Sequence, residues 1–504
     1  MTESLTRRVV RNIGWAALVN FLSQATQLAG YVVLWRLLMP KDFGVTAVAG
    51  LTIAALSLLR DFGFKMALVQ TQEDLAKSAN VTFWVNLLLN GLCYTFLFVM
   101  AMPIARFFTI QPESEVLTFL QETIIGSEAR TLLVRVLRTL GLVLIVDCFG
   151  DVQLMLFRKG LQFRKLLSPT VISSFVSTAL AVTMAYFGFG VWSLVGASLS
   201  RSATNAIVMF FVSPWRPAFQ FDWKVARKMA CFGMHMTGAS ILIFLITQGD
   251  DAIVGKVLGL VALGFYRVSY NLSNLPATHV SHVLSQVIFP AYAEIGDDRA
   301  RAGHAWTRVT RYTALLALPV TLVLVCLANE LVLVFCGSKW EAATMAVTIL
   351  GLFGFSRAIG VTFGELFKGM GKPKYLTRIA FVQACIVLPL VYYATRWGIE
   401  GACWAVVFGG CLADLMGLVY MHRLTGTPWA KVVQAFAPSA VSGAAMALTL
   451  LGGKHVLSVV LNLPPLATLV ILLPVAAAVY GAVCYGLYRD LYQEAKSLVF
   501  QRSA

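Results

Sequence analysis

The chain has 504 residues, of which 58% are hydrophobic and 13% are charged, and its mean hydropathy is +0.77. Because a soluble domain carries about 25% charged residues, this composition excludes a soluble protein and indicates one that lies in a bilayer. The net charge of +16 does not indicate nucleic acid as a partner, because basic residues gather in the cytoplasmic loops of membrane proteins.

Apolar stretches long enough to cross a membrane recur along the whole chain. A spanning helix needs about 20 apolar residues, and that length predicts an all-α integral membrane protein with about 14 transmembrane helices. The basic N-terminus runs into the first stretch without a cleavage site, so we expect a retained helix rather than a signal peptide. In chain order, the predicted spans are 13–38, 43–68, 80–105, 134–156, 167–187, 190–212, 229–249, 258–290, 312–335, 343–366, 376–395, 399–421, 432–453 and 465–488.

The distribution of Lys and Arg predicts the orientation of these spans. Placing both termini in the cytoplasm puts most basic residues in the inner loops, as expected for a multi-pass protein of the bacterial inner membrane. The segment 106–138 departs from this rule, because it lies outside and carries four arginines. Its apolar spacing predicts an amphipathic helix on the outer leaflet. A docking site for a partner is the alternative.

Three sequence matches, in the same order in both halves, indicate an internal repeat. Residues 36–44 match 256–264 in a basic residue, a Leu, an apolar residue and a final Gly. A Lys-Gly pair with a second Lys six residues after the first occurs at 159–165 and at 368–374. A Gly-rich turn ending in Trp precedes the sixth and the twelfth span. The unit of six helices predicts a parallel repeat, as in transporters whose two lobes rock around a central site.

The repeat predicts three parts of the chain. Residues 1–220 form an N-lobe of helices 1–6, and residues 221–425 form a C-lobe of helices 7–12. Residues 426–504 hold helices 13 and 14. We expect alternating access to a site between the lobes, a mechanism that requires such a duplication and that an enzyme seldom needs.

Four arginines fall inside predicted spans, where an ionised side chain costs about 2.5–3.5 kcal/mol and usually faces water or a partner. Together they predict a cationic cavity that binds an anionic cargo, since Arg holds phosphate through bidentate hydrogen bonds. A structural ion pair is the alternative, and it is strongest for Arg60 beside Asp61. The predicted substrate-binding set is Arg60, Arg201, Arg267, Arg357 and Arg36.

Acidic residues in or beside the spans are candidates for ion coupling. Asp147 and Asp151 share one helix face, so their repulsion favours a bound proton or cation at one of them; alternatively, each offsets an Arg of the opposite lobe. The candidate set is Asp61, Asp147, Asp151, Asp250, Glu365 and Asp414. We expect no cofactor, with coupling to an H+ or Na+ gradient left open. No metal site is expected, because the nine cysteines form no C-x-x-C and His279 and His282 have no acids at ligand spacing.

Several stretches spread over nearly the whole chain resemble the polysaccharide-transporter branch of the multidrug/oligosaccharidyl-lipid/polysaccharide (MOP) flippase superfamily, the Wzx-type exporters. The resemblance is carried by their order and spacing. The stretches are Trp35–Gly44, Asp61–Gly63, Ala67–Gln70, Gly188–Val195, Ser213–Pro217, Leu263–Tyr270, Leu284–Pro290 and Trp397–Gly401.

This resemblance implies a function in exopolysaccharide, capsule or O-antigen biosynthesis. The cargo would be an undecaprenyl-diphosphate-linked oligosaccharide repeat unit, moved from the cytoplasmic to the periplasmic leaflet through a cationic central cavity. Helices 13 and 14 would form a groove for its lipid tail. Membrane lipids and the polysaccharide polymerase and export machinery are the implied partners. A flippase performs no covalent chemistry, so no catalytic residue is expected.

Two other functions remain open. A drug/cation antiporter of the same superfamily should have an acidic cavity, and the four arginines disfavour it. A membrane glycosyltransferase, polymerase or ligase usually needs a sizeable extramembrane domain, whereas the longest predicted outer loop here has about 30 residues. Accumulation of lipid-linked intermediates in a deletion strain would favour the flippase.

Overall fold

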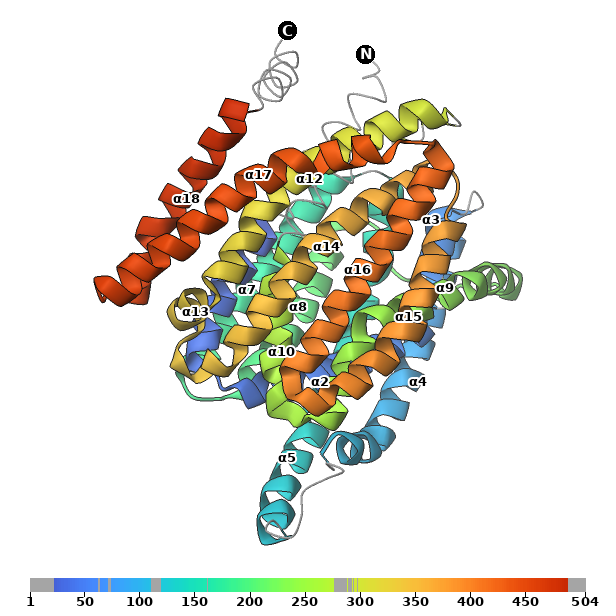
Figure 1. Ribbon diagram of the computed structural model, residues 1–504. Helices are drawn as coiled ribbons and strands as arrows, with labels where there is room; N and C mark the ends of the chain where they lie inside the picture. The colour runs from blue at the N-terminus through green and yellow to red at the C-terminus, as the bar shows by residue number, and fades with distance from the viewer. Residues whose placement is uncertain are drawn as a thin grey trace. The chain divides into compact units, whose positions relative to one another are not determined.

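The computed structural model describes residues 22–61, 64–70, 74–109, 119–160, 162–275, 288, 292, 294–296 and 298–487 (Figure 1). In these ranges the regular elements are all helices, which confirms the predicted all-α class. The chain divides into two compact units, residues 1–267 and 268–504. The predicted boundaries at 220 and 425 stay predictions.

The first unit begins with a helix at 22–37 and extends into α10. The elements that follow that helix are α2 Pro40–Asp61, α3 Phe64–Gln70, α4 Leu75–Thr109, α5 Phe119–Leu140, α6 Leu142–Lys159, η1 Phe163–Leu166, α7 Leu167–Tyr186, α8 Val191–Val212, α9 Trp223–Val257 and α10 Gly259–Ser273.

The second unit contains the remaining helices. They are α12 Arg299–Cys326, α13 Ala328–Leu331, η3 Val332–Cys336, η4 Ser338–Ala343, α14 Thr344–Gly369, α15 Lys374–Ala394, η5 Thr395–Trp397, α16 Gly398–Thr425, α17 Trp429–Lys454, η6 His455–Val460 and α18 Pro465–Leu487.

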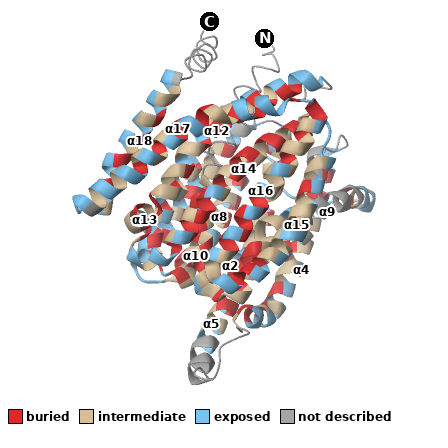
Figure 2. Ribbon diagram, in the orientation of Figure 1, coloured by how far each residue is buried: buried red, intermediate tan, exposed pale blue. Residues whose placement is uncertain are grey.

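Burial follows the pattern of a protein surrounded by lipid. Large apolar side chains such as Phe175, Leu88 and Val470 are exposed, while small and polar residues such as Asn86 and Ser442 are buried between helices. Figure 2 shows this mixture along α18, where many residues are exposed. Among the described residues, nine stretches are long and apolar enough to span a membrane, and one of them, Lys374–Thr425, contains both α15 and α16. The multi-pass prediction is confirmed, and the count of fourteen stays a prediction.

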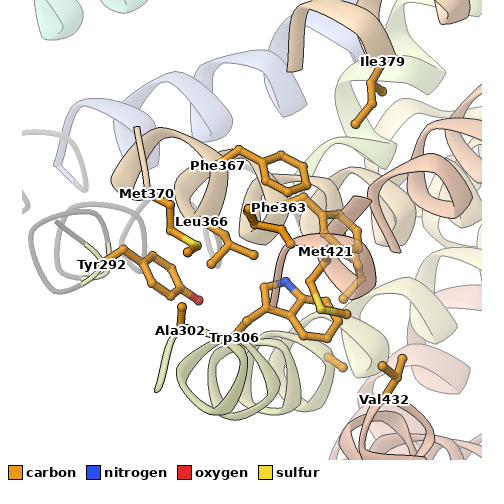
Figure 3. Packing of buried hydrophobic residues seen from close by; sticks show 13 residues of the cluster. Tyr292, Ala302, Trp306, Phe363, Leu366, Phe367, Met370, Ile379, Met421 and Val432 are labelled. Atoms are coloured by element: carbon orange, nitrogen blue, oxygen red, sulfur yellow. The ribbon is translucent and has the colours of Figure 1, made fainter. Parts of the chain in front are cut away.

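The core of the second unit is a cluster of aromatic and aliphatic side chains on α12, α14 and α16 (Figure 3). The rings of Trp306 and Phe363 stack with centroids 5.3 Å apart. Tyr292 lies at one edge of the cluster, where burial and, secondarily, the charge of Glu365 raise the pKa of its phenol. Its hydroxyl therefore stays protonated and neutral.

Helices α2 and α10 touch through two glycines at matched positions of the repeat. A Cβ atom built on Gly44 would lie 1.7 Å from the carbonyl oxygen of Leu260. A Cβ atom on Gly264 would lie 2.0 Å from the carbonyl oxygen of Pro40. Pro40 and Gly44 correspond in the sequence repeat to Leu260 and Gly264, so the two contacts are reciprocal.

The basic segment contains α5, as the predicted helix requires, but the C-terminal part of α5 packs within the protein instead of lying on the surface of the bilayer. Leu133, Val136 and Leu137 are fully buried, because α5 continues through Gly141 directly into α6 and packs on α4. Arg138 donates to the carbonyl oxygen of Phe98 at 3.3 Å and lies 4.1 Å over its ring.

Two further basic residues bind the C-terminal end of α4. Lys256 donates to the carbonyl oxygen of Phe107 at 2.7 Å, and Arg130 donates to the Thr109 hydroxyl at 3.4 Å. Cations are favourable beside the last carbonyls of a helix. Lys256 and Arg130 therefore have a structural use at the end of α4.

Candidate functional site

Arg201 lies in the middle of α8, in the first unit. Small residues bring α8 close to α7, among them Ser173, Ser177 and Ala181. The half-buried Arg201 guanidinium donates to the Ser177 hydroxyl at 3.4 Å, and Tyr31 is close enough to interact with its charge. Among the described residues, no carboxylate forms an ion pair with it.

Arg357 holds a comparable position on α14, in the second unit. Its guanidinium donates to the Tyr270 hydroxyl and lies 5.8 Å from the ring centroids of Tyr270 and Phe353. The side chain is half-buried in a helix that is apolar enough to span the membrane. Here too, no ion pair with a carboxylate occurs in the part of the chain that the structure describes.

The other predicted arginines differ from these two. Arg267 forms an ion pair with the buried carboxylate of Asp251, so its charge is compensated within the first unit. Arg36 is exposed at the end of the helix 22–37. The side chains of Arg60 and Asp61 lie outside the described residues. Arg201 and Arg357 are therefore the described members of the set that combine burial with an uncompensated charge.

The described candidate acids all have polar partners within the protein. Asp151 pairs with Lys65 of α3 at 2.8 Å, and Glu365 pairs with Lys368 at 3.3 Å. Asp250 accepts a hydrogen bond of 2.5 Å from Tyr266. Asp147 accepts a hydrogen bond from Ser202 of α8 at 2.6 Å.

Asp147 and Asp414 take part in matching hydrogen bonds. In the first unit, Ser202 of α8 donates to Asp147 of α6 at 2.6 Å. In the second, Ser356 of α14 donates to Asp414 of α16 at 2.6 Å. The sequence repeat makes Asp147 equivalent to Ser356, and Ser202 equivalent to Asp414, so acid and serine have exchanged helices. Neither serine belongs to the predicted set, although each adjoins the uncompensated arginine of its unit, and this adjacency is the sequence signal that identifies them.

The described residues contain no group of three or more His, Cys, Asp or Glu side chains that could hold a metal ion. His279 and His282, considered as ligands from the sequence, lie outside the described ranges. The site offers guanidinium and hydroxyl donors, which suit an anion rather than a metal.

Sequence comparison identifies relatives in polysaccharide biosynthesis. A family model described as "Polysaccharide biosynthesis protein" matches residues 33–130 and 116–345. The succinoglycan biosynthesis transport protein ExoT of Rhizobium meliloti is 27% identical over 86% of this chain and 84% of its own length. The lipopolysaccharide biosynthesis protein WzxC of Escherichia coli is 21% identical over 82% of this chain and 78% of its own length.

Structural comparison identifies transporters of the same fold. The lipid II flippase MurJ, in an inward closed conformation, matches 95% of this chain and 99% of its own, with a TM-score of 0.72 at 13% identity. An inward-facing multidrug resistance transporter of the MATE family matches 80% of this chain and 94% of its own, with a TM-score of 0.58 at 14% identity. The fold is thus that of the MOP transporters, and since the family model matches more than half of its residues, the chain belongs to the polysaccharide biosynthesis protein family.

Proposed function

We propose that this protein is a flippase that moves a polyprenyl-diphosphate-linked oligosaccharide from the cytoplasmic to the periplasmic leaflet by alternating access. The observation that carries the proposal is the pair Arg201 and Arg357, one in each compact unit. Both guanidinium groups are half-buried in apolar helices, and neither forms an ion pair with a carboxylate of the described residues. A buried charge without a partner is unfavourable and indicates a ligand of opposite charge.

A diphosphate suits these two residues chemically. A guanidinium group binds two phosphate oxygens at once, and such charge-assisted bonds are about twice as strong as neutral ones. Ser177 and Tyr270 already hold the two arginines by one nitrogen each, which orients the group and leaves other N–H donors for the cargo. The names of the relatives, which include succinoglycan and lipopolysaccharide biosynthesis proteins, support a saccharide on the lipid.

The function is tested by substituting each of the two arginines in turn. The host is a deletion strain that carries the variant gene on a plasmid. We expect Arg201→Ala and Arg357→Ala each to abolish export and to accumulate lipid-linked oligosaccharide on the cytoplasmic leaflet. Arg201→Lys and Arg357→Lys should export partially, because lysine keeps the charge but loses the bidentate geometry.

Arg396→Ala is the matched control, because Arg396 is exposed and lies over the ring of Tyr393 in a short turn between α15 and α16. This variant should export like the wild type. All variants are first checked for insertion by their amount in the membrane. Normal export by both alanine variants would contradict the proposal.

The two other functions have less support. The similarity of fold to a multidrug resistance transporter of the MATE family is the support for a drug/cation antiporter. The uncompensated arginines, however, would repel a cationic drug. Cation-dependent drug efflux from a sensitive strain would revive this function. The glycosyltransferase or polymerase has no support from the comparisons, since ExoT and MurJ are named as a transport protein and a flippase. Incorporation of labelled sugar by the purified protein would revive it.

The proposed function also implies a membrane and an orientation for the protein. We infer that the protein lies in the bacterial inner membrane with both termini in the cytoplasm, because most basic residues then fall in inner loops. The polymerase and export machinery of the polysaccharide would act on the outer leaflet and receive the flipped cargo. Helices α17 and α18, which pack along each other, would accommodate the lipid tail.

A further inference from the structure

Helix α12 contains a proline, and the helix packs differently on the two sides of it. Because proline has no backbone N–H, Pro319 cannot donate to the carbonyl oxygen of Leu315, four residues earlier. Before the proline, Trp306 and Ala314 pack in the core cluster of α12, α14 and α16. After it, Leu327 packs in a second cluster, formed with side chains of α17 and α18. Pro319 therefore lies between two separately packed clusters.

The carbonyl oxygen that the proline leaves without its usual helical donor is bound by α18. The Tyr480 hydroxyl donates to the oxygen of Leu315 at 2.9 Å. Tyr480 is 9% exposed, and its ring packs in the second cluster together with the side chain of Leu315. A tyrosine 165 residues away in the chain therefore supplies the hydrogen bond that α12 cannot supply itself.

The same stretch of α12 contacts the helix that carries Arg357. Ala317, two residues before Pro319, packs in a small cluster with Ala358 of α14, and both alanines are fully buried. Small residues of this kind allow the backbones of two helices to approach closely. Ala358 directly follows Arg357. A movement of α12 near Pro319 would therefore shift the backbone that positions the Arg357 guanidinium.

We propose that Pro319 is a hinge of α12 and that Tyr480 is a positioning residue that couples this hinge to α18. Prolines are common points of bending in helices. A displacement of α18 would pull on the carbonyl group of Leu315, change the bend of α12 and move the backbone beside Arg357. The proposal deepens the flippase function, on which it rests for the roles of α18 and Arg357 in binding the lipid tail and the diphosphate. It connects these two parts of the cargo site.

The hydrogen bond is tested by a double-mutant cycle on the thermal stability of the purified full chain in detergent. Tyr480→Phe leaves the Leu315 oxygen without this donor, so Tm should fall by about 2 °C. In Pro319→Ala, residue 319 has an N–H that can donate to the same oxygen. Tyr480→Phe should therefore change Tm little in the Pro319→Ala background, a coupling that independent sites do not show. Tyr392→Phe, at an exposed tyrosine of α15, should leave Tm unchanged in both backgrounds.

The hinge is tested by hydrogen exchange of the backbone amides of α12, measured on the same purified proteins. Amides at 320–323, just after Pro319, should exchange several-fold faster in Tyr480→Phe than in the wild type, because loss of the hydrogen bond favours local opening. In Pro319→Ala they should exchange more slowly. Amides at 306–310, which lie in the other cluster, should not change. An equal acceleration along the whole of α12 would indicate a general loss of stability and would contradict the hinge.

The role in transport is tested by export in the deletion strain, measured relative to the amount of protein in the membrane. We expect Pro319→Ala to be at least as stable as the wild type and yet to export several-fold less, because an uninterrupted helix bends less readily. Tyr480→Phe should also export several-fold less, because α18 no longer moves the hinge. Tyr392→Phe should export like the wild type.

Three results would overturn the proposal. Equal losses of Tm from Tyr480→Phe in both backgrounds would show that the hydroxyl does not replace the missing donor of Pro319. Unchanged exchange at 320–323 in Tyr480→Phe would exclude the hinge, and this result needs no proline variant to fold. Normal export by both variants would remove the link with transport.

The two proposals can fail separately. The Tm and exchange measurements use no cargo, so they do not depend on the flippase function. Normal export by Arg201→Ala and Arg357→Ala would contradict the flippase but leave the coupling of Tyr480 with Pro319 intact.

Discussion

Arginines inside apolar helices are equivalent in the sequence but differ in the structure. Arg267 has an acid partner sixteen residues earlier in the chain, on a different helix. Arg201 and Arg357 are held by a serine and a tyrosine instead. Hydropathy and spacing identify a charge in a span, but they contain no information on which acid from another helix meets it. Side-chain contacts in the structure therefore decide which of the predicted arginines are compensated by an acid and which are not.

Glu330 and Lys454 offer a test of what a compensated charge contributes. Glu330 is 4% exposed, and its carboxylate pairs with Lys454 of α17 at 3.1 Å. Because removal of one partner leaves an uncompensated buried charge, we expect Lys454→Met to lower the free energy of unfolding by about 3–5 kcal/mol. Denaturant unfolding in detergent, followed by tryptophan fluorescence, would measure this loss.

The double variant Glu330→Gln/Lys454→Met separates the charge from the packing. It removes both charges at once, so most of the stability should return. A double variant as unstable as the single one would show that Lys454 acts through its contacts and not through its charge.

At the level of helices, the contact of α2 with α10 depends on the absence of two side chains. Gly44 and Gly264 allow a backbone carbonyl of the other helix to approach each Cα atom. The sequence repeat already singled out both glycines as matched positions. It did not reveal that they touch each other's helices, because a repeat in sequence does not state how the two copies pack.

Gly44→Ala should prevent this close approach. Its Cβ would meet the backbone of Leu260, which cannot rotate away, so we expect a loss of about 1–3 kcal/mol, as for other overpacked sites. Gly50→Ala in the same helix is the control, because a Cβ there has nothing within 4 Å.

The control substitution removes a helix glycine without a clash and should keep or slightly raise stability. Thermal unfolding of the two purified variants gives the comparison, and export in cells shows whether the contact matters for transport. Equal Tm values for Gly44→Ala and Gly50→Ala would contradict the importance of the α2–α10 contact.

At the scale of the whole molecule, the turns before α8 and α16 have a similar backbone conformation, in agreement with the sequence repeat. Gly188 and Gly398, matched in the repeat, both have positive φ values, of 80° and 72°. Such a backbone suits glycine because it has no Cβ. The helices that follow, α8 and α16, correspond to the sixth and twelfth predicted spans.

The predicted orientation can be tested at the end of the chain. Alkaline phosphatase folds only outside the cytoplasm, where disulfides form. A fusion after Gly426, between α16 and α17, should be inactive, and a fusion after Asn462, between η6 and α18, should be active. The reverse pattern would show that the predicted orientation of α17 and α18 is wrong.

Helicity and repeated crossing of the membrane could be predicted from the amino acids alone. These properties follow from hydropathy, which acts locally along the chain. Only the folded chain reveals which charges are compensated, that α5 packs on α4, and that Arg267 pairs with Asp251. Those outcomes depend on contacts between helices distant in sequence, because the energy of a buried charge is set by the groups around it.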